Sequence, residues 1–339
     1  MSAPTQAPTD APTIDVHAHV LLPEIDQAVE GHDGLAEARA LDARRNGPEA
    51  LTVSGAMVRM RIPLLTDVTA RLAAMDAASV DIQLVSPSPS HYHYWADEEL
   101  ARQVWRTANE GTAAHCARAP GRLLGLGLVP LQHPHLAAQA LDHALSLGLR
   151  GAEISSHAPG RDLSDPAYED LWTRAEATGA LLFLHPFGCT LDERLDRWYL
   201  SNSVGQPVEN AVALSHLIFS GVLDRHPRLV LIAAHGGGYL PTHIGRADHA
   251  WRVRTDTRGC ARQPSDYLKQ LYFDSLVHDP DVLRELVRVA GADHVLLGSD
   301  FPFDMGIDRP LDALRAAALP EPDFRAIRGG TAAAMLGIS

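Results

Sequence analysis

Residues 14–19 of the chain read IDVHAH, and this stretch decides how the fold is interpreted. It begins with apolar and β-branched residues, which favour a β-strand. Side chains at positions i and i+2 of a strand project to the same side, so His17 and His19 point one way while Val16 and Ala18 point the other. The stretch therefore predicts a strand that ends in a pair of histidines facing a common space.

Similar short runs, β-branched or rich in leucine, recur along the rest of the chain. Together with the first they cover residues 13–20, 80–85, 123–129, 149–155, 180–185, 228–234, 270–276 and 294–299. Segments of helical periodicity lie between them, for example residues 136–147, 165–179, 208–224 and 281–290. Strand alternating with helix eight times predicts an α/β protein with a (β/α)8 TIM barrel, formed as a single domain by residues 13–339.

Two segments stand outside this repeat. Residues 21–67 contain glycine, proline and charged residues without a sustained period. We expect them to form an insertion after the first strand that lies over the mouth of the barrel. Residues 1–12 are rich in proline, alanine and threonine and carry little apolar mass, so we expect a disordered tail there.

The composition excludes several classes of function. The formal charge of −13 argues against binding of nucleic acid or of an anionic membrane surface. The three cysteines are far apart in the sequence, which indicates neither a disulfide framework nor a thiolate zinc site. No signal sequence and no apolar stretch of membrane-spanning length is recognisable, so we expect a cytoplasmic protein whose partner is a small molecule.

Candidate reactive side chains cluster at predicted strand ends, where (β/α)8 barrels carry their chemistry. Besides the first strand, the fifth ends at His185, the sixth at His235 and the eighth at Asp300. A lone histidine on a strand is more often a hydrogen-bonded core residue. Imidazole nitrogens and carboxylate oxygens at four strand ends, however, form a donor set suited to zinc or a similar divalent ion, with one position left open.

Five motifs add a resemblance to a known family. They are IDVHAH, FLHPFG, AHGGGYLP, FDSLVHDP and GSDFPF. The set resembles the amidohydrolase-related (amidohydrolase 2) family, in the branch typified by 2-amino-3-carboxymuconate-6-semialdehyde decarboxylase and the enzymes that decarboxylate hydroxylated benzoates. The resemblance extends from about residue 14 to residue 336, and it implies a barrel of the metal-dependent hydrolase superfamily type.

The resemblance also implies the roles of the strand-end residues. His17, His19, His185 and Asp300 match the positions that hold one catalytic metal ion, usually zinc and in some relatives manganese. His235 and Asp300 match the catalytic residues, and His235 is the one that moves the proton of the metal-bound water. A divalent ion lowers the pKa of bound water from about 15.7 to about 7, which makes this chemistry available at neutral pH.

Two arginines match substrate-binding positions of the family. Arg59 precedes Met75 by the number of residues that the family shows. Arg246 likewise follows His235 at the family's distance along the sequence. The resemblance implies that both bind substrate carboxylates and that Arg246 reaches the site from the neighbouring subunit of a homodimer. Bidentate pairing with a carboxylate suits the planar guanidinium group.

The lysine content separates two kinds of amidohydrolase site. Lys269 is the only lysine, and it precedes the seventh predicted strand. Barrels that hold two metal ions often bridge them with a carboxylated lysine at the end of the fourth strand, but residues 150–155 contain none. A mononuclear site is therefore expected, and a Schiff-base mechanism at that strand end is excluded.

These observations favour a carboxy-lyase: a metal-dependent, non-oxidative decarboxylase of an unsaturated or aromatic carboxylic acid. In this hypothesis His235 and the metal-bound water protonate or hydrate the carbon that carries the carboxylate. Two alternatives use the same site, namely a hydrolase of an amide or lactone and a hydratase of a conjugated diacid. The loop after the fifth strand departs from the family pattern at Phe187, Gly188 and Asn202, so the substrate itself stays open.

Overall fold

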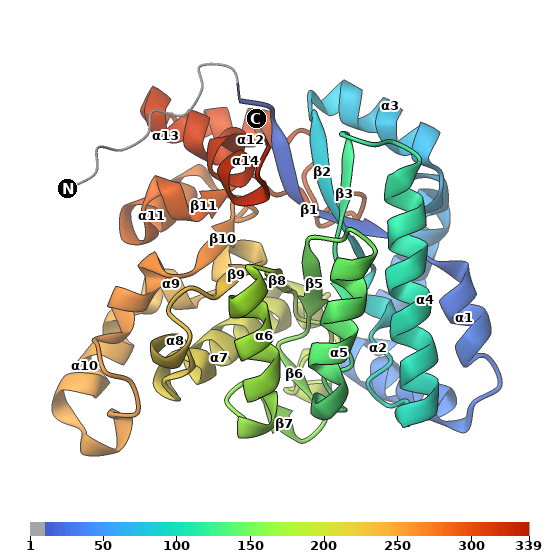
Figure 1. The fold of residues 1–339 in the computed structure, drawn as a ribbon, viewed down its shortest axis with the longest axis horizontal. Coiled ribbons are helices and arrows are strands. Elements are labelled where there is room, and N and C mark those ends of the chain that lie inside the picture. The colour runs from blue at the N-terminus through green and yellow to red at the C-terminus, as the bar shows by residue number, and fades with distance from the viewer. Residues whose placement is uncertain (1–10, 339) are drawn as a thin grey trace.

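A parallel β-sheet occupies the middle of the molecule and helices surround it (Figure 1). The computed structural model describes residues 11–338. The barrel strands are β1 (Ile14–Val20), β2 (Ile82–Pro87), β3 (Leu123–Gly125), β4 (Gly127–Leu128), β5 (Gly151–Ile154), β8 (Leu181–Leu184), β9 (Val230–Ala233), β10 (Tyr272–Asp274) and β11 (Val295–Leu296). Because β3 and β4 are consecutive parts of one interrupted strand, the described chain forms the eight strands that the sequence predicts.

Backbone hydrogen bonds join these strands into a closed ring. The pairs run in the orders β1-β2-β3 and β4-β5-β8-β9-β10-β11, and every pair in them is parallel. The two arcs meet where the amide of Leu126 donates to the carbonyl of Val85 at 2.8 Å. On the other side the amide of Val16 donates to the carbonyl of Leu297 at 2.9 Å. The (β/α)8 barrel is therefore confirmed.

Alternate side chains of one strand enter different parts of the core, as the two-residue repeat of a strand requires. Leu182 and Leu184 of β8 belong to the cluster that packs against the helices, together with Trp172. Phe183 belongs to a second cluster, and its ring lies 4.9 Å from the ring of His17. The inward face of β8 thus leads directly to the predicted metal ligands.

The helices of the described chain alternate with the strands and cover the barrel (Figure 1). None of the helices within residues 11–338 combines the length and the apolar character needed to cross a membrane. They are α1 (Pro23–Val29), α2 (Asp33–Thr66), α3 (Val68–Ala78), α4 (Glu98–Ala117), α5 (Pro134–Ser146), α6 (Glu169–Thr178), α7 (Gln206–Phe219), α8 (Val222–Arg225), α9 (Leu240–His243), α10 (Gly245–Val253), α11 (Pro280–Ala290), α12 (Pro310–Ala316), α13 (Glu321–Arg325) and α14 (Thr331–Leu336). A hairpin of β6 (His157–Ala158) and β7 (Arg161–Asp162) lies outside the barrel sheet.

The segment after the first strand is helical, which the sequence pattern does not predict. Residues 23–66 form α1 and the long α2, and α2 is kinked at Gly47, where φ is 76°. A side chain there would collide with the carbonyl of Asp196, so only glycine allows this contact. Pro48 follows the kink, where the second half of α2 begins and a missing N–H costs little.

The predicted tail extends two residues too far. Residues 1–10 lie outside the described part of the chain. Ala11, by contrast, is buried, and its carbonyl accepts a hydrogen bond of 2.6 Å from the guanidinium of Arg328. Ala11 and Pro12 therefore belong to the packed structure, because Arg328 of the C-terminal region fastens the backbone just before β1.

Candidate metal centre

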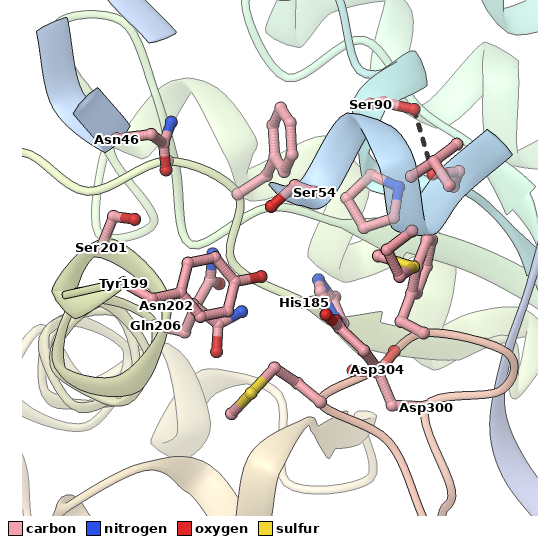
Figure 2. Close-up of a pocket in the computed structure, with 18 of the residues that line it drawn as sticks. Asn46, Ser54, Ser90, His185, Tyr199, Ser201, Asn202, Gln206, Asp300 and Asp304 are labelled. Carbon is pink, nitrogen blue, oxygen red and sulfur yellow. Dashed lines mark hydrogen bonds between the residues drawn. The ribbon is translucent and has the colours of Figure 1, made fainter. Parts of the chain in front are cut away.

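The four predicted metal ligands converge at one end of the barrel. His17 and His19 lie on β1, His185 follows β8 directly, and Asp300 follows β11. One ligand atom from each residue lies within 4.8 Å of all the others, and all four residues are buried. Figure 2 shows His185 and Asp300 side by side at the edge of a cavity. The structure thus brings together residues that are up to 283 positions apart in the sequence.

The unpaired atoms of this cluster fit a divalent cation. Both ring nitrogens of His185 and Oδ1 of Asp300 are buried without a hydrogen-bond partner in residues 11–338. Nε2 of His17 and Nε2 of His19 lie 3.4 and 3.3 Å from that oxygen. Buried lone pairs that face one another are unfavourable unless a proton or a cation lies between them. Three imidazoles and one carboxylate are the donors that zinc and similar ions prefer.

The charges around the cluster also favour a cation. Burial lowers the pKa of His17, but the carboxylates of Asp300 and Asp274 outweigh burial and raise this pKa to about 9. Burial raises the pKa of Asp300, but His17 and His19 outweigh it and hold the pKa well below its usual range. The pKa of His185 is lowered, by burial first and then by the neighbouring histidines. His185 is therefore neutral and can offer a lone pair.

Asp274, at the end of β10, fixes the orientation of the first ligand. Nδ1–H of His17 donates to its carboxylate at 2.6 Å. The same carboxylate accepts from the backbone amides of His235 at 3.0 Å and Gly236 at 2.8 Å. With Nδ1 engaged in this way, Nε2 of His17 is the ring atom that can bind a metal ion, which displaces the proton from it. Asp274 is not among the residues predicted from the sequence, although the motif FDSLVHDP places a carboxylate at the end of the seventh strand.

A second buried carboxylate, Asp15, supports the backbone beneath the ligands. It accepts from the amide of His17 at 3.1 Å and from the amide of Ser299, next to Asp300, at 3.0 Å. The side chain of Gln83 also donates to it at 3.0 Å. Arg71 in turn donates to the amide oxygen of Gln83 at 3.0 Å. These bonds tie the first strand to the last one.

His235 lies beside the ligand cluster. Its ring centroid is 4.9 Å from that of His185, and its Nε2 is 3.9 Å from Oδ2 of Asp300. The side chain is 17% exposed, so solvent protons can reach it. His235 and Asp300 both have positive φ, 54° and 58°, a conformation that costs about 1–3 kcal/mol for a residue other than glycine. Two strained residues at one site are typical of a functional centre.

A cavity of about 280 Å³ opens in front of His185, His235 and Asp300. This volume is near the lower end of the roughly 300–1,000 Å³ of small-molecule sites, which suits a single-ring ligand. Helix α2 covers it, and η4 (Ser201–Gly205) with the start of α7 forms another side. Its polar lining beyond the ligand cluster comprises Asp42, Asn46, Ser54, Ser88, Ser90, Tyr199, Ser201, Asn202, Gln206 and Asp304.

The two predicted substrate-binding arginines lie outside this cavity. Arg59 is exposed on α2, although its neighbours Met57 and Val58 line the cavity. Arg246 is exposed on α10. In a single chain, as described over residues 11–338, neither guanidinium lines the space before the metal ligands. The substrate-binding role of both residues stays a prediction.

Comparison with known proteins defines the class to which this fold and site belong. Residues 14–338 match the Amidohydrolase family, and the chain belongs to it. The chain is 31% identical over 331 residues to 2-amino-3-carboxymuconate-6-semialdehyde decarboxylase of Dictyostelium discoideum, covering 96% of this chain and 91% of that protein. It is 30% identical over 268 residues to gamma-resorcylate decarboxylase of Rhizobium radiobacter, covering 75% and 82% of the two chains.

Solved structures of decarboxylases share the whole fold. The 5-carboxyvanillate decarboxylase of Sphingomonas paucimobilis is 25% identical, with a TM-score of 0.81 over 97% of this chain and 100% of the other. The dihydroxybenzoic acid decarboxylase of Polaromonas sp. JS666 is 25% identical, with a TM-score of 0.79 over 97% and 98% of the two chains. That structure contains manganese and the inhibitor 2-nitroresorcinol.

Replacing Asp274 with asparagine should weaken metal binding about 10- to 100-fold. The variant loses the negative charge that pairs with Nδ1–H of His17, while Nε2 of His17 is unchanged. Competition with a chromophoric chelator measures the affinity. Asp248→Asn is the matched control, since Asp248 is also buried but bonds only to residues 263–265 among its side-chain partners. Equal affinities in the two variants would show that Asp274 does not support the metal site.

Proposed function

We propose that this protein is a metal-dependent carboxy-lyase that removes CO2 without oxidation from an aromatic or unsaturated carboxylic acid. The observation that carries the proposal is the convergence of three histidines and Asp300 beside His235, at the mouth of a cavity of single-ring size. The likeness to decarboxylases over nearly the whole chain supports the reaction type. It gives no support to the hydrolase and hydratase alternatives. The proposed role is the breakdown of aromatic compounds.

We propose that His17, His19, His185 and Asp300 hold one divalent cation, zinc or manganese. The three imidazoles suit zinc, and the bound manganese in the Polaromonas enzyme supports manganese as well. When bound, the cation acts as a Lewis acid that orients the substrate and stabilises negative charge on its oxygen atoms. Asp300 also lies next to His235 and keeps a negative charge beside the imidazole.

We propose that His235 donates the proton that replaces the carboxylate. The imidazolium transfers a proton to the carbon that carries the carboxylate, and the C–C bond then breaks. The electron pair of the broken C–C bond returns to the unsaturated system, CO2 leaves, and hydrogen occupies the position of the carboxylate. His235 recovers a proton from solvent through its exposed edge. The hydrogen bond from the backbone amide of His235 to the carboxylate of Asp274 keeps His235 in place during these steps.

The reaction can be tested by incubating the zinc- or manganese-loaded protein with hydroxybenzoates, muconate derivatives and lactones. We expect at least one acid to release CO2, with the matching decarboxylated product. Chelation should abolish turnover, and added zinc or manganese should restore it. Activity without CO2 release, or activity that survives complete removal of the metal, would refute the proposed reaction.

His235→Ala should lower kcat about 10²- to 10⁴-fold while the metal content stays near one ion per chain, because the variant loses the proton donor and keeps the four ligands. Metal analysis and CO2 release are measured on the same preparation. His135→Ala provides the control, since His135 is an exposed histidine on α5. Full turnover in His235→Ala would assign the proton transfer to another group.

We propose further that the protein forms a homodimer in which Arg59 and the partner's Arg246 bind the substrate carboxylate. The exposure of Arg246 on α10 leaves it available to a second copy of the chain. If the site is shared, mixing inactive Arg246→Ala with inactive His235→Ala should restore about a quarter of the normal activity after random subunit exchange. Verified exchange without recovery of activity would contradict the shared site.

A further inference from the structure

We propose that Glu153 is a positioning residue of the metal centre, which aligns His19 and, through Tyr92, the segment that carries His185. The inference rests on the proposed metal site and adds a second supporting carboxyl group to it, besides that of Asp274. Glu153 lies at the end of the fourth barrel strand, the position where barrels with two metal ions often carry a carboxylated lysine.

Glu153 points from β5 into the barrel. Its neighbours Ala152 and Ile154 belong to the cluster that packs against the helices, so the side chain between them faces the other way. The residue is fully buried. Strand pairing places β5 beside β8, which leads directly to His185 (Figure 1). Burial of a carboxyl group is unfavourable unless polar groups surround it, and the polar groups around Glu153 belong to the metal ligands and their neighbours.

The first of these groups is the imidazole of His19. Ser86 is paired with His19 across β1 and β2, and its Oγ lies 3.2 Å from Nδ1 of His19. Oε2 of Glu153 lies 3.6 Å from the same nitrogen. The oxygens of Ser86 and Glu153 both attract an N–H at this position, whereas Nε2 of His19 faces Asp300 at 3.3 Å. The arrangement keeps a proton on Nδ1 and leaves Nε2 as the ring atom that can bind a metal ion.

Oε2 of Glu153 is available for this purpose. It is buried and has no hydrogen-bond partner in the described part of the chain. An unpaired buried acceptor is costly, so orientations of the His19 ring that bring Nδ1–H toward Glu153 are favoured. The same orientations point Nε2 toward the metal position. Glu153 therefore restrains the ring of a ligand that it does not bind through a direct hydrogen bond.

The second group is the hydroxyl of Tyr92, which extends the support to another ligand. It lies 2.7 Å from Oε1 of Glu153 and 2.8 Å from the carbonyl oxygen of His185, and it can donate to either acceptor. Tyr92 is buried, and its ring stacks on that of Tyr94 at 5.2 Å with the planes 7° apart. The stacked rings hold the hydroxyl in place, so Tyr92 connects Glu153 with the backbone of His185.

The position of Glu153 favours support over a role as a bridging ligand. The ligand cluster found among residues 11–338 contains His17, His19, His185 and Asp300 but not Glu153. Glu153 faces Nδ1 of His19, on the other side of the ring from the nitrogen that faces Asp300. An oxygen behind the ring is not placed to bind the ion that Nε2 faces. Glu153 therefore acts through His19.

Metal affinity tests the inference without turnover. The affinity for zinc is measured by competition with a chromophoric chelator. Glu153→Leu should weaken zinc binding about 10- to 100-fold, because it removes both oxygens behind His19. Glu153→Gln keeps one acceptor oxygen and should recover part of this loss. At saturating zinc the wild type and both variants should bind close to one ion per chain.

Tyr92→Phe is the second variant if Glu153→Leu fails to fold, as judged by thermal melting. Loss of the hydroxyl should weaken zinc binding about 2- to 10-fold, as expected for one hydrogen bond. Tyr168→Phe is the matched control, because Tyr168 is also buried and donates to the carbonyl of Leu131 at 2.9 Å, outside the ligand cluster. The control should bind zinc like the wild type.

The visible spectrum of the cobalt-loaded protein separates positioning from general destabilisation. The d–d bands of cobalt(II) depend on the arrangement of the ligand atoms. Glu153→Leu and Tyr92→Phe should shift these bands at full loading, whereas Tyr168→Phe should leave them unchanged. A loss of stability alone would leave the spectrum of the folded, loaded protein as in the wild type.

Unchanged zinc affinity in Glu153→Leu and Tyr92→Phe would overturn the inference, as would weaker binding with unchanged cobalt bands. Two zinc ions per chain, reduced to one in Glu153→Leu, would assign a bridging role to Glu153 instead. The proposed reaction can fail separately. The expected affinities without CO2 release from any acid would refute the decarboxylase and support the positioning role. CO2 release with unchanged affinities in the variants would refute the positioning role alone.

Discussion

A buried chain of polar contacts beneath the metal ligands holds the barrel together where it closes. Arg71 is fully buried, and its guanidinium donates to the carbonyl of His19 and to Gln83, which donates to Asp15. Asp15 also accepts hydrogen bonds from the backbone amide and the hydroxyl of Ser299. Burying ionisable groups costs several kcal/mol each unless hydrogen bonds offset the lost hydration, and here such bonds span the first, second and last strands. Barrel closure and ligand geometry thus depend on the same contacts.

Asp274 likewise serves two parts of the site through one side chain. One carboxylate orients the imidazole of His17 and accepts the amides of His235 and Gly236, so it stabilises both a metal ligand and the left-handed backbone of the proposed proton donor. Strain at His235 is tolerable because the neighbouring amides are engaged in the native state. The proposed metal ligand and the proposed proton donor are therefore linked through a residue to which neither role is assigned.

The strands and the convergence of His17, His19, His185 and Asp300 were predictable, because both follow from local patterns: a two-residue alternation and polar residues at strand ends. Lys269 is exposed before β10 and Glu153 occupies β5, so the expectation of a mononuclear site stays a prediction. Helix α2 was not predictable, because it buries only Gly47, Met57 and Leu65 and so lacks an apolar stripe. The cavity lining was equally hidden, since it depends on how α2 and α7 meet over the barrel.

The position of α2 separates two kinds of residue in space and in sequence. The predicted metal ligands lie at the ends of strands that the core holds in place, whereas α2 contributes more of the other cavity-lining residues than any other element does. Substitutions on α2 touch few core contacts, because most of its side chains are not buried. Sequence changes in this helix can therefore alter the shape of the cavity while the proposed metal ligands stay in place, which makes the segment a natural starting point for engineering other substrates.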